Sequence, residues 1–239
     1  GPAGCVAALI LARAGLSVTL CEAEAALPAD LRASTFHPPT LDMLDDLGLV
    51  EGLLAQGLTA PAYQFRDRAS GEAATFDIAA ISDLTAFPFR LQCEQFKLTR
   101  LALAALAPLA EIRFGARLTA LAQDETGATA TIETEAGPET LRARYVVGCE
   151  GASSVARKAI GAGFEGFTYP EQWVVASTPE DFAERLPGLS PVSYTADPDE
   201  WFVLLRVPGL WRVLLPFPED ATPEDALSDE TLERRLQGV

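Results

Sequence analysis

Basic residues are scarce in this sequence of 239 residues. It carries 18 basic against 34 acidic side chains, a formal net charge of -16, and its only lysines are Lys97 and Lys158. A surface that binds nucleic acid or an anionic membrane needs clustered Lys and Arg, and the sequence has no basic run. We therefore expect neither nucleic acid nor a membrane as a partner. The acidity itself indicates solubility and says little about the substrate.

Histidine, cysteine and long apolar runs are also scarce. His37 is the only histidine, so any Ser-His or Cys-His nucleophile would have to use it. The cysteines, Cys5, Cys21, Cys93 and Cys149, form no CxxC pair, which predicts neither a disulfide scaffold nor a zinc site. The apolar run from Cys5 to Leu11 is too short to span a bilayer. We expect no metal, no covalent catalytic residue and a cytoplasmic location.

The residues that are present favour a globular α/β protein of one large domain or two interlocked ones. Small and apolar residues from Pro2 to Ala14 predict a buried helix that Gly15 ends, and Leu16 to Glu22 predicts a strand. A helix followed directly by a strand is half of a βαβ unit. The sequence begins at Gly1 without Met, so we expect it to be part of a longer chain.

Later segments alternate between α/β and pure β patterns. This alternation predicts a dinucleotide-binding domain interrupted by a second, sheet-based domain. The segments are a helix from Pro38 to Leu47, a hairpin over 61–90 around Ser70-Gly71, a helix from Glu94 to Leu106, a β-meander that returns to an apolar strand at Tyr145–Val147, a helix from Ser154 to Ile160, β-like runs within 164–218, and a final helix capped by Ser228.

Two glycine-containing turns are candidates for a nucleotide site. Gly1-Pro2-Ala3-Gly4 opens the first helix, and Glu22 follows 18 residues after Gly4. Glycines allow a pyrophosphate to approach the backbone at a helix start, and an acid about 20 residues later binds ribose hydroxyls. The second turn, Gly148-Cys149-Glu150-Gly151, links the predicted apolar strand to a helix. Taken singly, each could be an ordinary turn.

With both turns in this order, the sequence resembles the FAD-dependent aromatic hydroxylases, the single-component flavoprotein monooxygenases typified by para-hydroxybenzoate hydroxylase. Members of that family start with GxGPAG and carry a later GADGxxSxVR stretch. The resemblance implies a Rossmann-like ββα FAD-binding domain with an interleaved mixed β-sheet substrate domain. It places the FAD-binding domain at residues 1–60 and 91–160, and the substrate domain at 61–90 and 161–239. The following positions are those expected to bind FAD: Gly1, Pro2, Ala3, Gly4, Glu22, Arg32, Gln92, Leu118, Glu150 and Gly151.

The sequence departs from the family pattern in two ways. Glu150 stands where the family usually has Asp, and its carboxylate extends one methylene further. The second flavin motif of the family begins with Gly-Asp, a pair that occurs nowhere here. We therefore expect the chain to be an incomplete piece that lacks the first strand and that second motif, and that is inactive alone if it cannot retain FAD.

The resemblance implies an oxidoreductase that hydroxylates a phenolic or other aromatic small molecule. In that family NADH or NADPH reduces the flavin, and O2 then yields a flavin hydroperoxide that attacks the ring. A halogenase, epoxidase or reductase of the same fold is an alternative, as is an NAD-binding dehydrogenase. Neither the substrate nor the choice of nucleotide is specified, and a homodimer is left open.

Several other residues have a structural interpretation that we favour. Arg206 and Arg212 flank a hairpin turn, where arginines are usually solvated, although either could meet an acidic substrate. Trp173, Trp201 and Trp211 are typical of sheet packing as well as of an aromatic pocket.

Overall fold

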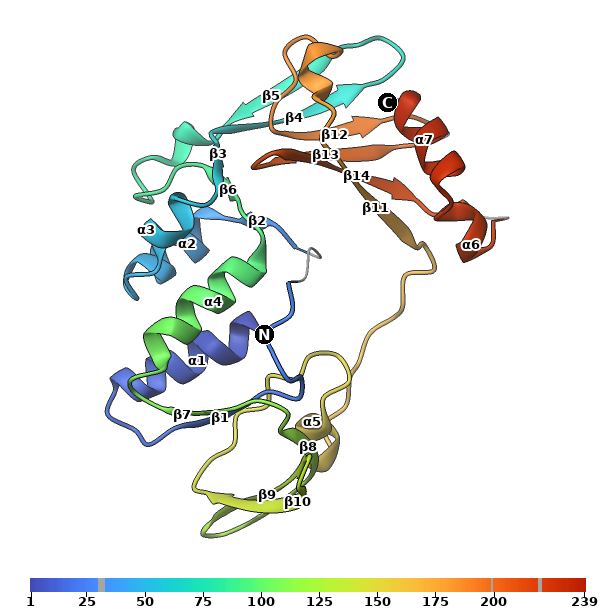
Figure 1. The fold of residues 1–239 in the computed structure, drawn as a ribbon. Coiled ribbons are helices and arrows are strands. Elements are labelled where there is room, and N and C mark those ends of the chain that lie inside the picture. Colours follow the sequence, from blue (N-terminus) through green and yellow to red (C-terminus); the bar gives the residue numbers. More distant parts are fainter. Residues whose placement is uncertain (30–32, 199, 219–220) are drawn as a thin grey trace. The chain divides into compact units, whose positions relative to one another are not determined.

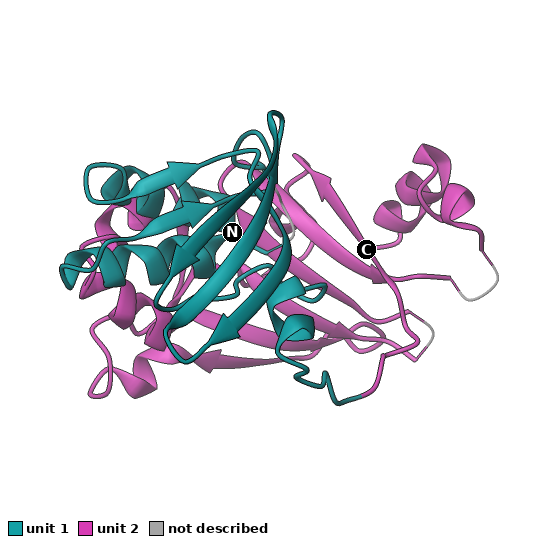
Figure 2. Ribbon diagram, turned by 90° about the horizontal axis from the view of Figure 1, so that it is seen from below, with its two compact units in different colours: residues 1–33, 95–166 teal, residues 34–94, 167–239 magenta. Residues whose placement is uncertain are grey.

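The structure, a computed structural model, describes residues 1–29, 33–198, 200–218 and 221–239. The chain divides into two compact units, each built from two separate stretches (Figure 2). Unit 1 comprises Gly1–Ala33 and Gln95–Gly166, and unit 2 comprises Ser34–Glu94 and Phe167–Val239. This interleaving agrees with the predicted fold class. The bounds differ from the predicted domains, because residues 34–60 and 91–94 group with unit 2 and residues 161–166 with unit 1.

Unit 1 combines helices with two small sheets (Figure 1). Strands β1 and β7 pair in parallel, with Leu20 opposite Ile112, and helices α1 and α4 pack side by side. Strands β8, β9 and β10 form the antiparallel meander. The elements in chain order are α1 (Pro2–Arg13), β1 (Thr19–Cys21), α4 (Gln95–Leu106), β7 (Glu111–Arg113), β8 (Arg117–Asp124), β9 (Gly127–Thr134), β10 (Gly137–Ala143) and α5 (Val155–Ala159).

Helix α1 forms where the sequence predicts it. Pro2 occupies the first turn, where its missing N–H would have no partner in any case. Cys5, Ala8 and Leu9 are buried on one face, and the helix ends before Gly15, which adopts a φ of 82°. Only glycine adopts this left-handed conformation without strain. The order of helix and strand predicted for residues 2–22 is therefore confirmed.

The meander packs a small apolar core made of Ala116, Ala130 and Ile132. Gly127 opens β9 with a φ of 154°, and a Cβ built at this position would lie 2.4 Å from the carbonyl oxygen of Ala143. No side chain fits at this distance unless β10 moves. The predicted Thr126-Gly127 turn is confirmed, and its glycine is required by close backbone approach as well as by conformation.

Gly127→Ala is accordingly expected to destabilise the protein by about 3 kcal/mol, because it combines a strained φ with a backbone clash. Urea denaturation followed by circular dichroism measures the loss. Gly137→Ala is the matched control, because Gly137 has a φ of 109° but no atom within 4 Å of a built Cβ. Equal losses for the two variants would contradict the assigned role of the Ala143 carbonyl.

Unit 2 is built around a six-stranded sheet in the order β11-β14-β13-β12-β4-β5 (Figure 1). A second sheet has the order β2-β6-β3. The elements are β2 (Thr35–Phe36), α2 (Pro38–Asp45), α3 (Val50–Leu54), β3 (Leu58–Ala60), β4 (Ala62–Asp67), β5 (Ala73–Asp77), a 3-10 turn (Ile78–Ile81), β6 (Arg90–Gln92), β11 (Trp173–Thr178), a second 3-10 turn (Phe182–Glu184), β12 (Val192–Ala196), β13 (Phe202–Val207), β14 (Leu210–Pro216), α6 (Pro223–Ala226) and α7 (Asp229–Gln237).

The predicted hairpin over 61–90 is confirmed as β4 and β5, and it joins the C-terminal strands. Tyr63 lies opposite Phe76 in the antiparallel hairpin, and β4 pairs in parallel with β12, which places Phe65 opposite Tyr194. One face of the sheet packs the main core of the unit: Phe182, Phe202, Leu204, Trp211, Val213 and Leu215.

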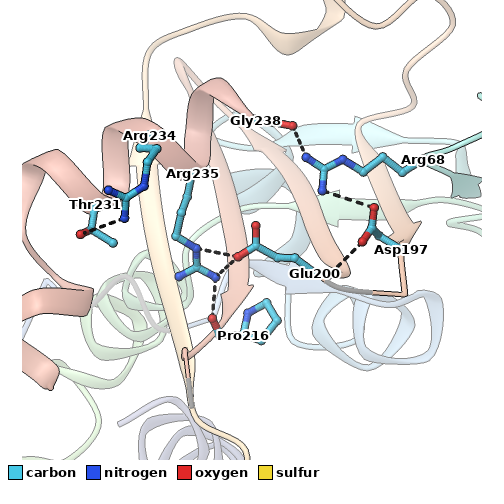
Figure 3. Close-up of polar contacts among 8 residues, drawn as sticks. All are labelled: Arg68, Asp197, Glu200, Pro216, Thr231, Arg234, Arg235 and Gly238. Atoms are coloured by element: carbon cyan, nitrogen blue, oxygen red, sulfur yellow. Dashed lines mark hydrogen bonds and ion pairs between the residues drawn. The ribbon is translucent and has the colours of Figure 1, made fainter. Parts of the chain in front are cut away.

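Polar contacts fasten the C-terminal helix α7 to this sheet (Figure 3). Arg235 donates from Nε to Glu200 at 2.7 Å and from Nη2 to the carbonyl of Pro216 at 2.6 Å. Arg68 bonds the carbonyl of Gly238 and lies 3.4 Å from Asp197. The predicted cap is confirmed, because the hydroxyl of Ser228 accepts a hydrogen bond from the N–H of Thr231.

One predicted strand is wrong. Residues 145–147 form no strand, and Tyr145 is 81% exposed. A strand requires a hydrogen-bonded neighbour, and none of the described strands pairs with this segment. The apolar composition of Tyr145–Val147 therefore corresponds here neither to a paired strand nor to a buried segment.

Candidate cofactor site

The start of α1 offers backbone donors to an anion. Gly1 is the N-cap residue, and no side chain of the described residues caps this end by a hydrogen bond. A helix leaves its first N–H groups without intrahelical partners, and the aligned peptide dipoles favour negative charge there. In this 12-residue helix the N–H groups of Ala3 and Gly4 are therefore suited to a phosphate group.

Glu22 lies at this same helix start. Its carboxylate is 3.4 Å from the nitrogen of Gly1 and accepts a hydrogen bond from the N–H of Glu24 at 3.1 Å. The strand β1 positions it, because β1 ends at Cys21, directly before the acid. The spacing of Gly4 and Glu22 in the sequence thus corresponds to a real proximity in unit 1.

The second glycine turn also reaches the start of α1. A Cβ built at Gly4 would lie 3.3 Å from the Cβ of Cys149, the neighbour of Glu150. The glycine allows residues 148–151 and the first turn of α1 to approach closely. The structure therefore brings together seven of the predicted residues, those of the two turns and Glu22: Gly1, Pro2, Ala3, Gly4, Glu22, Glu150 and Gly151.

The side chain of Glu150 turns toward α5. Its carboxylate accepts hydrogen bonds from the N–H groups of Val155 and Ala156, each at 3.0 Å, and from the hydroxyl of Ser154 at 2.8 Å. The pKa of Glu150 is lowered. Desolvation alone would raise this pKa, but the hydrogen bonds from Ala156, Ser154 and Val155 stabilise the ionised carboxylate by more. The Glu150 carboxylate thus holds the 148–151 turn against the start of α5 through hydrogen bonds from the backbone of that helix.

Glu150→Gln is expected to destabilise the protein by about 1 kcal/mol at pH 7, as the loss of a helix-capping carboxylate does. The folded-state pKa lies below the unfolded value of about 4.3, so this stabilisation is present above that value and is lost as the pH falls through the folded pKa. The difference between wild type and variant in urea denaturation should therefore shrink below about pH 4. Glu165→Gln, an exposed carboxylate, is the control. A difference that persists unchanged at low pH would contradict the capping role of the charge.

Leu118 is the remaining predicted residue of unit 1 that the structure describes. Leu118 packs partly buried against the meander core, next to a register shift in β8. Its segment is tied to Glu22, because the N–H of Ala116 donates to the Glu22 carbonyl at 2.8 Å. Arg32 lies outside the described residues.

Gln92 belongs to unit 2, on β6. It is fully buried, and its Oε1 accepts a hydrogen bond from the hydroxyl of Thr35 at 2.9 Å. Its Nε2 has no acceptor among the described residues. A buried amide donor without a partner is costly, so an acceptor from a bound group would stabilise this arrangement.

Arg212 is buried, which its position beside a hairpin turn in the sequence does not indicate. The residue is 4% exposed, and its Nη1 donates to the hydroxyl of Ser34 at 2.8 Å. The two residues are 178 positions apart, so no local pattern could reveal the contact. The expectation that Arg212 is solvated is wrong, because the register of β14 turns it toward Ser34.

Other kinds of site find no support in the part of the chain that the structure describes. No group of His, Cys, Asp and Glu there could hold a metal ion. None of the helices found over those residues has the length and apolar character needed to cross a membrane.

Comparison with known proteins decides the family. A family profile described as "FAD binding domain" matches residues 1–236. The chain belongs to this family of FAD-binding domains. Among curated relatives of this FAD-binding domain, para-nitrophenol 4-monooxygenase of Pseudomonas sp. strain WBC-3 is 32% identical over 99% of the chain, and 6-hydroxy-3-succinoylpyridine 3-monooxygenase of Pseudomonas putida strain S16 is 28% identical over 92%. The chain spans 58% and 56% of the length of these two proteins.

Solved structures share the fold of this FAD-binding domain. The p-nitrophenol 4-monooxygenase PnpA of Pseudomonas putida DLL-E4 matches 99% of the chain with a TM-score of 0.87 and 31% identity, over 59% of its own length. Aklavinone-11 hydroxylase, solved with FAD and aklavinone, matches 99% of the chain with a TM-score of 0.82 and 25% identity, over 48% of its own length. The predicted fold class and family are confirmed.

The residues present fit FAD. The uncapped helix start suits a pyrophosphate, Glu22 suits ribose hydroxyls, and Gln92 has a buried donor without an acceptor among the described residues.

Proposed function

We propose that this chain is the FAD-holding part of a monooxygenase that hydroxylates a phenolic or other aromatic ring with NADH or NADPH and O2. The observation that carries the proposal is the 32% identity with para-nitrophenol 4-monooxygenase over 99% of the chain. That match includes the sheet of unit 2 as well as the nucleotide-type fold of unit 1. An NAD-binding dehydrogenase would share only the second of these.

We assign FAD to unit 1 by its own residues. The N–H groups of Ala3 and Gly4 bind the pyrophosphate, and Glu22 accepts hydrogen bonds from ribose hydroxyls. Glu150 holds the 148–151 turn in shape through its bonds to α5. When bound, FAD would supply the redox chemistry that the reaction with the nicotinamide nucleotide and O2 requires.

We assign the aromatic substrate to the sheet of unit 2, and within the same unit Gln92 offers a buried N–H donor that has no acceptor among the described residues. The protein then has no need of a nucleophile, because its residues bind, orient and exclude water. Its cysteines form no disulfide with one another, which supports the cytoplasmic location proposed for it.

The test measures oxidation of NADH and NADPH by the full-length, FAD-loaded protein in the presence of a panel of phenols. We expect one or more phenols to stimulate both nucleotide oxidation and O2 uptake, and to yield a product with one additional oxygen atom. Oxygen consumption without such a product for every phenol tried, or reduction that needs no O2, would overturn the proposal.

A further inference from the structure

Arg90 occupies an unusual environment on an aromatic surface of unit 2. Four rings form this surface, here termed the aromatic face: Tyr63, Phe65, Phe76 and Tyr194. The rings of Tyr63 and Phe76 stack at 5.1 Å between centroids, and those of Phe65 and Tyr194 at 5.0 Å. Phe65 and Phe76 are 50% and 46% exposed, so the surface is open to a further planar ring.

The guanidinium of Arg90 lies over this face. Its central carbon is 4.3 Å from the centroid of the Tyr63 ring, and Nη1 donates to the Tyr194 hydroxyl at 3.1 Å. Both contacts orient the group without neutralising it. A guanidinium has five N–H donors, and the Tyr194 hydroxyl is the one acceptor that the structure gives them among the described residues.

No carboxylate of the described residues pairs with Arg90, although acidic residues outnumber basic ones by 34 to 18. Arginines that do pair with carboxylates include Arg68, Arg113, Arg117, Arg142, Arg185, Arg206 and Arg235. The nearby His37 adds no negative charge. Its pKa is lowered by desolvation and then by the charge of Arg90, so the imidazole is neutral at pH 7.

A partly buried guanidinium beside aromatic rings, held by neutral partners, is suited to an anion that arrives with a ligand. We infer that Arg90 is a specificity-determining residue that binds the charged oxygen of an aromatic substrate, a phenolate or a carboxylate, while the aromatic face receives its ring. This inference rests on the proposed function, because it assumes that unit 2 takes an aromatic substrate.

The test compares charged ligands with neutral ligands of nearly the same shape. The probes are 4-nitrophenolate against 4-nitroanisole, at a pH at which the phenol is ionised, and benzoate against benzamide. Calorimetric titration of the full-length protein gives the dissociation constants without requiring turnover. We expect wild type to bind each charged probe more tightly than its neutral partner.

Arg90→Met should weaken binding of the charged probes roughly 10- to 100-fold, the effect of losing a charge-assisted hydrogen bond, and leave the neutral probes nearly unchanged. Arg90→Lys should keep part of the preference, because the charge stays and the fork is lost. Arg66→Met is the control. Arg66 follows Phe65 on β4 and points to the opposite face of the sheet, where it contacts Gln64. Its replacement should leave the preference for charged over neutral probes intact.

Three results would overturn the inference: an unchanged preference in Arg90→Met, equal weakening of charged and neutral probes, or no binding of any probe by wild type. Nucleotide oxidation assayed on the same preparations separates the two proposals. Hydroxylation of a neutral ring without Arg90-dependent binding would refute the inference and leave the proposed function intact. Arg90-dependent binding without hydroxylation of any phenol would refute the proposed function.

Discussion

Replacement of Gly4 by valine is expected to lower the affinity of the protein for FAD about 100-fold, which corresponds to the loss of one or two hydrogen bonds to a charged phosphate. A side chain at Gly4 would occupy the space between the first turn of α1 and Cys149, where a built Cβ already lies 3.3 Å from the Cys149 Cβ. It would also keep the pyrophosphate from the backbone N–H groups.

Fluorescence titration of the apo-protein with FAD measures this change. Valine favours a helix over glycine but crowds Cys149, so thermal unfolding of the apo-protein is measured as well, and the titration is read at a temperature at which the variant is folded. Ala14→Val, at the exposed far end of the same helix, is the matched control and should bind FAD as wild type does. Tight FAD binding by the Gly4 variant would contradict the assignment of this turn to the pyrophosphate.

Trp211→Ala is expected to cost about 3–5 kcal/mol of folding free energy, the range for removing a large aromatic side chain from a core. Trp211 is 2% exposed, packs edge to face against Phe182 at 6.0 Å, and donates from its indole nitrogen to Asp181 at 3.0 Å. Removal of the Trp211 side chain leaves a cavity in the main core of unit 2 and deprives the Asp181 carboxylate of its indole N–H donor.

Urea denaturation measures the loss of folding free energy. Two further variants separate the contribution of the hydrogen bond from that of core packing. Trp211→Phe keeps most of the ring and removes the hydrogen bond, at a cost of about 1 kcal/mol. Trp201→Ala removes a tryptophan that is 46% exposed and should cost less than about 1 kcal/mol. If Trp201→Ala were as destabilising as Trp211→Ala, the core assigned to unit 2 would be wrong.

The elements that the sequence predicts well are those specified by neighbouring residues. Helix α1 is defined by Pro2 and Gly15, α7 by the Ser228 cap, and the β4–β5 hairpin by Ser70-Gly71. In each case the signal and the structure lie within one short segment. The spacing of Gly4 and Glu22 belongs to this group, because one helix and one strand separate them.

Features that depend on distant segments could not be predicted in the same way. The strand expected at Tyr145–Val147 has the right composition but no described strand beside it. The burial of Arg212 depends on Ser34, and the position of Arg90 depends on Tyr63 and Tyr194, which β4 and β12 bring together. The capping role of Glu150 depends on the direction of its carboxylate, which the sequence does not specify.

The assignment of FAD to this chain is tested most directly by the binding of flavin to the purified full-length protein. We expect one FAD per chain, a flavin absorbance spectrum that shifts when an aromatic ligand is added, and loss of FAD in the Gly4→Val variant. A colourless protein that takes up NAD but no FAD would contradict the assignment.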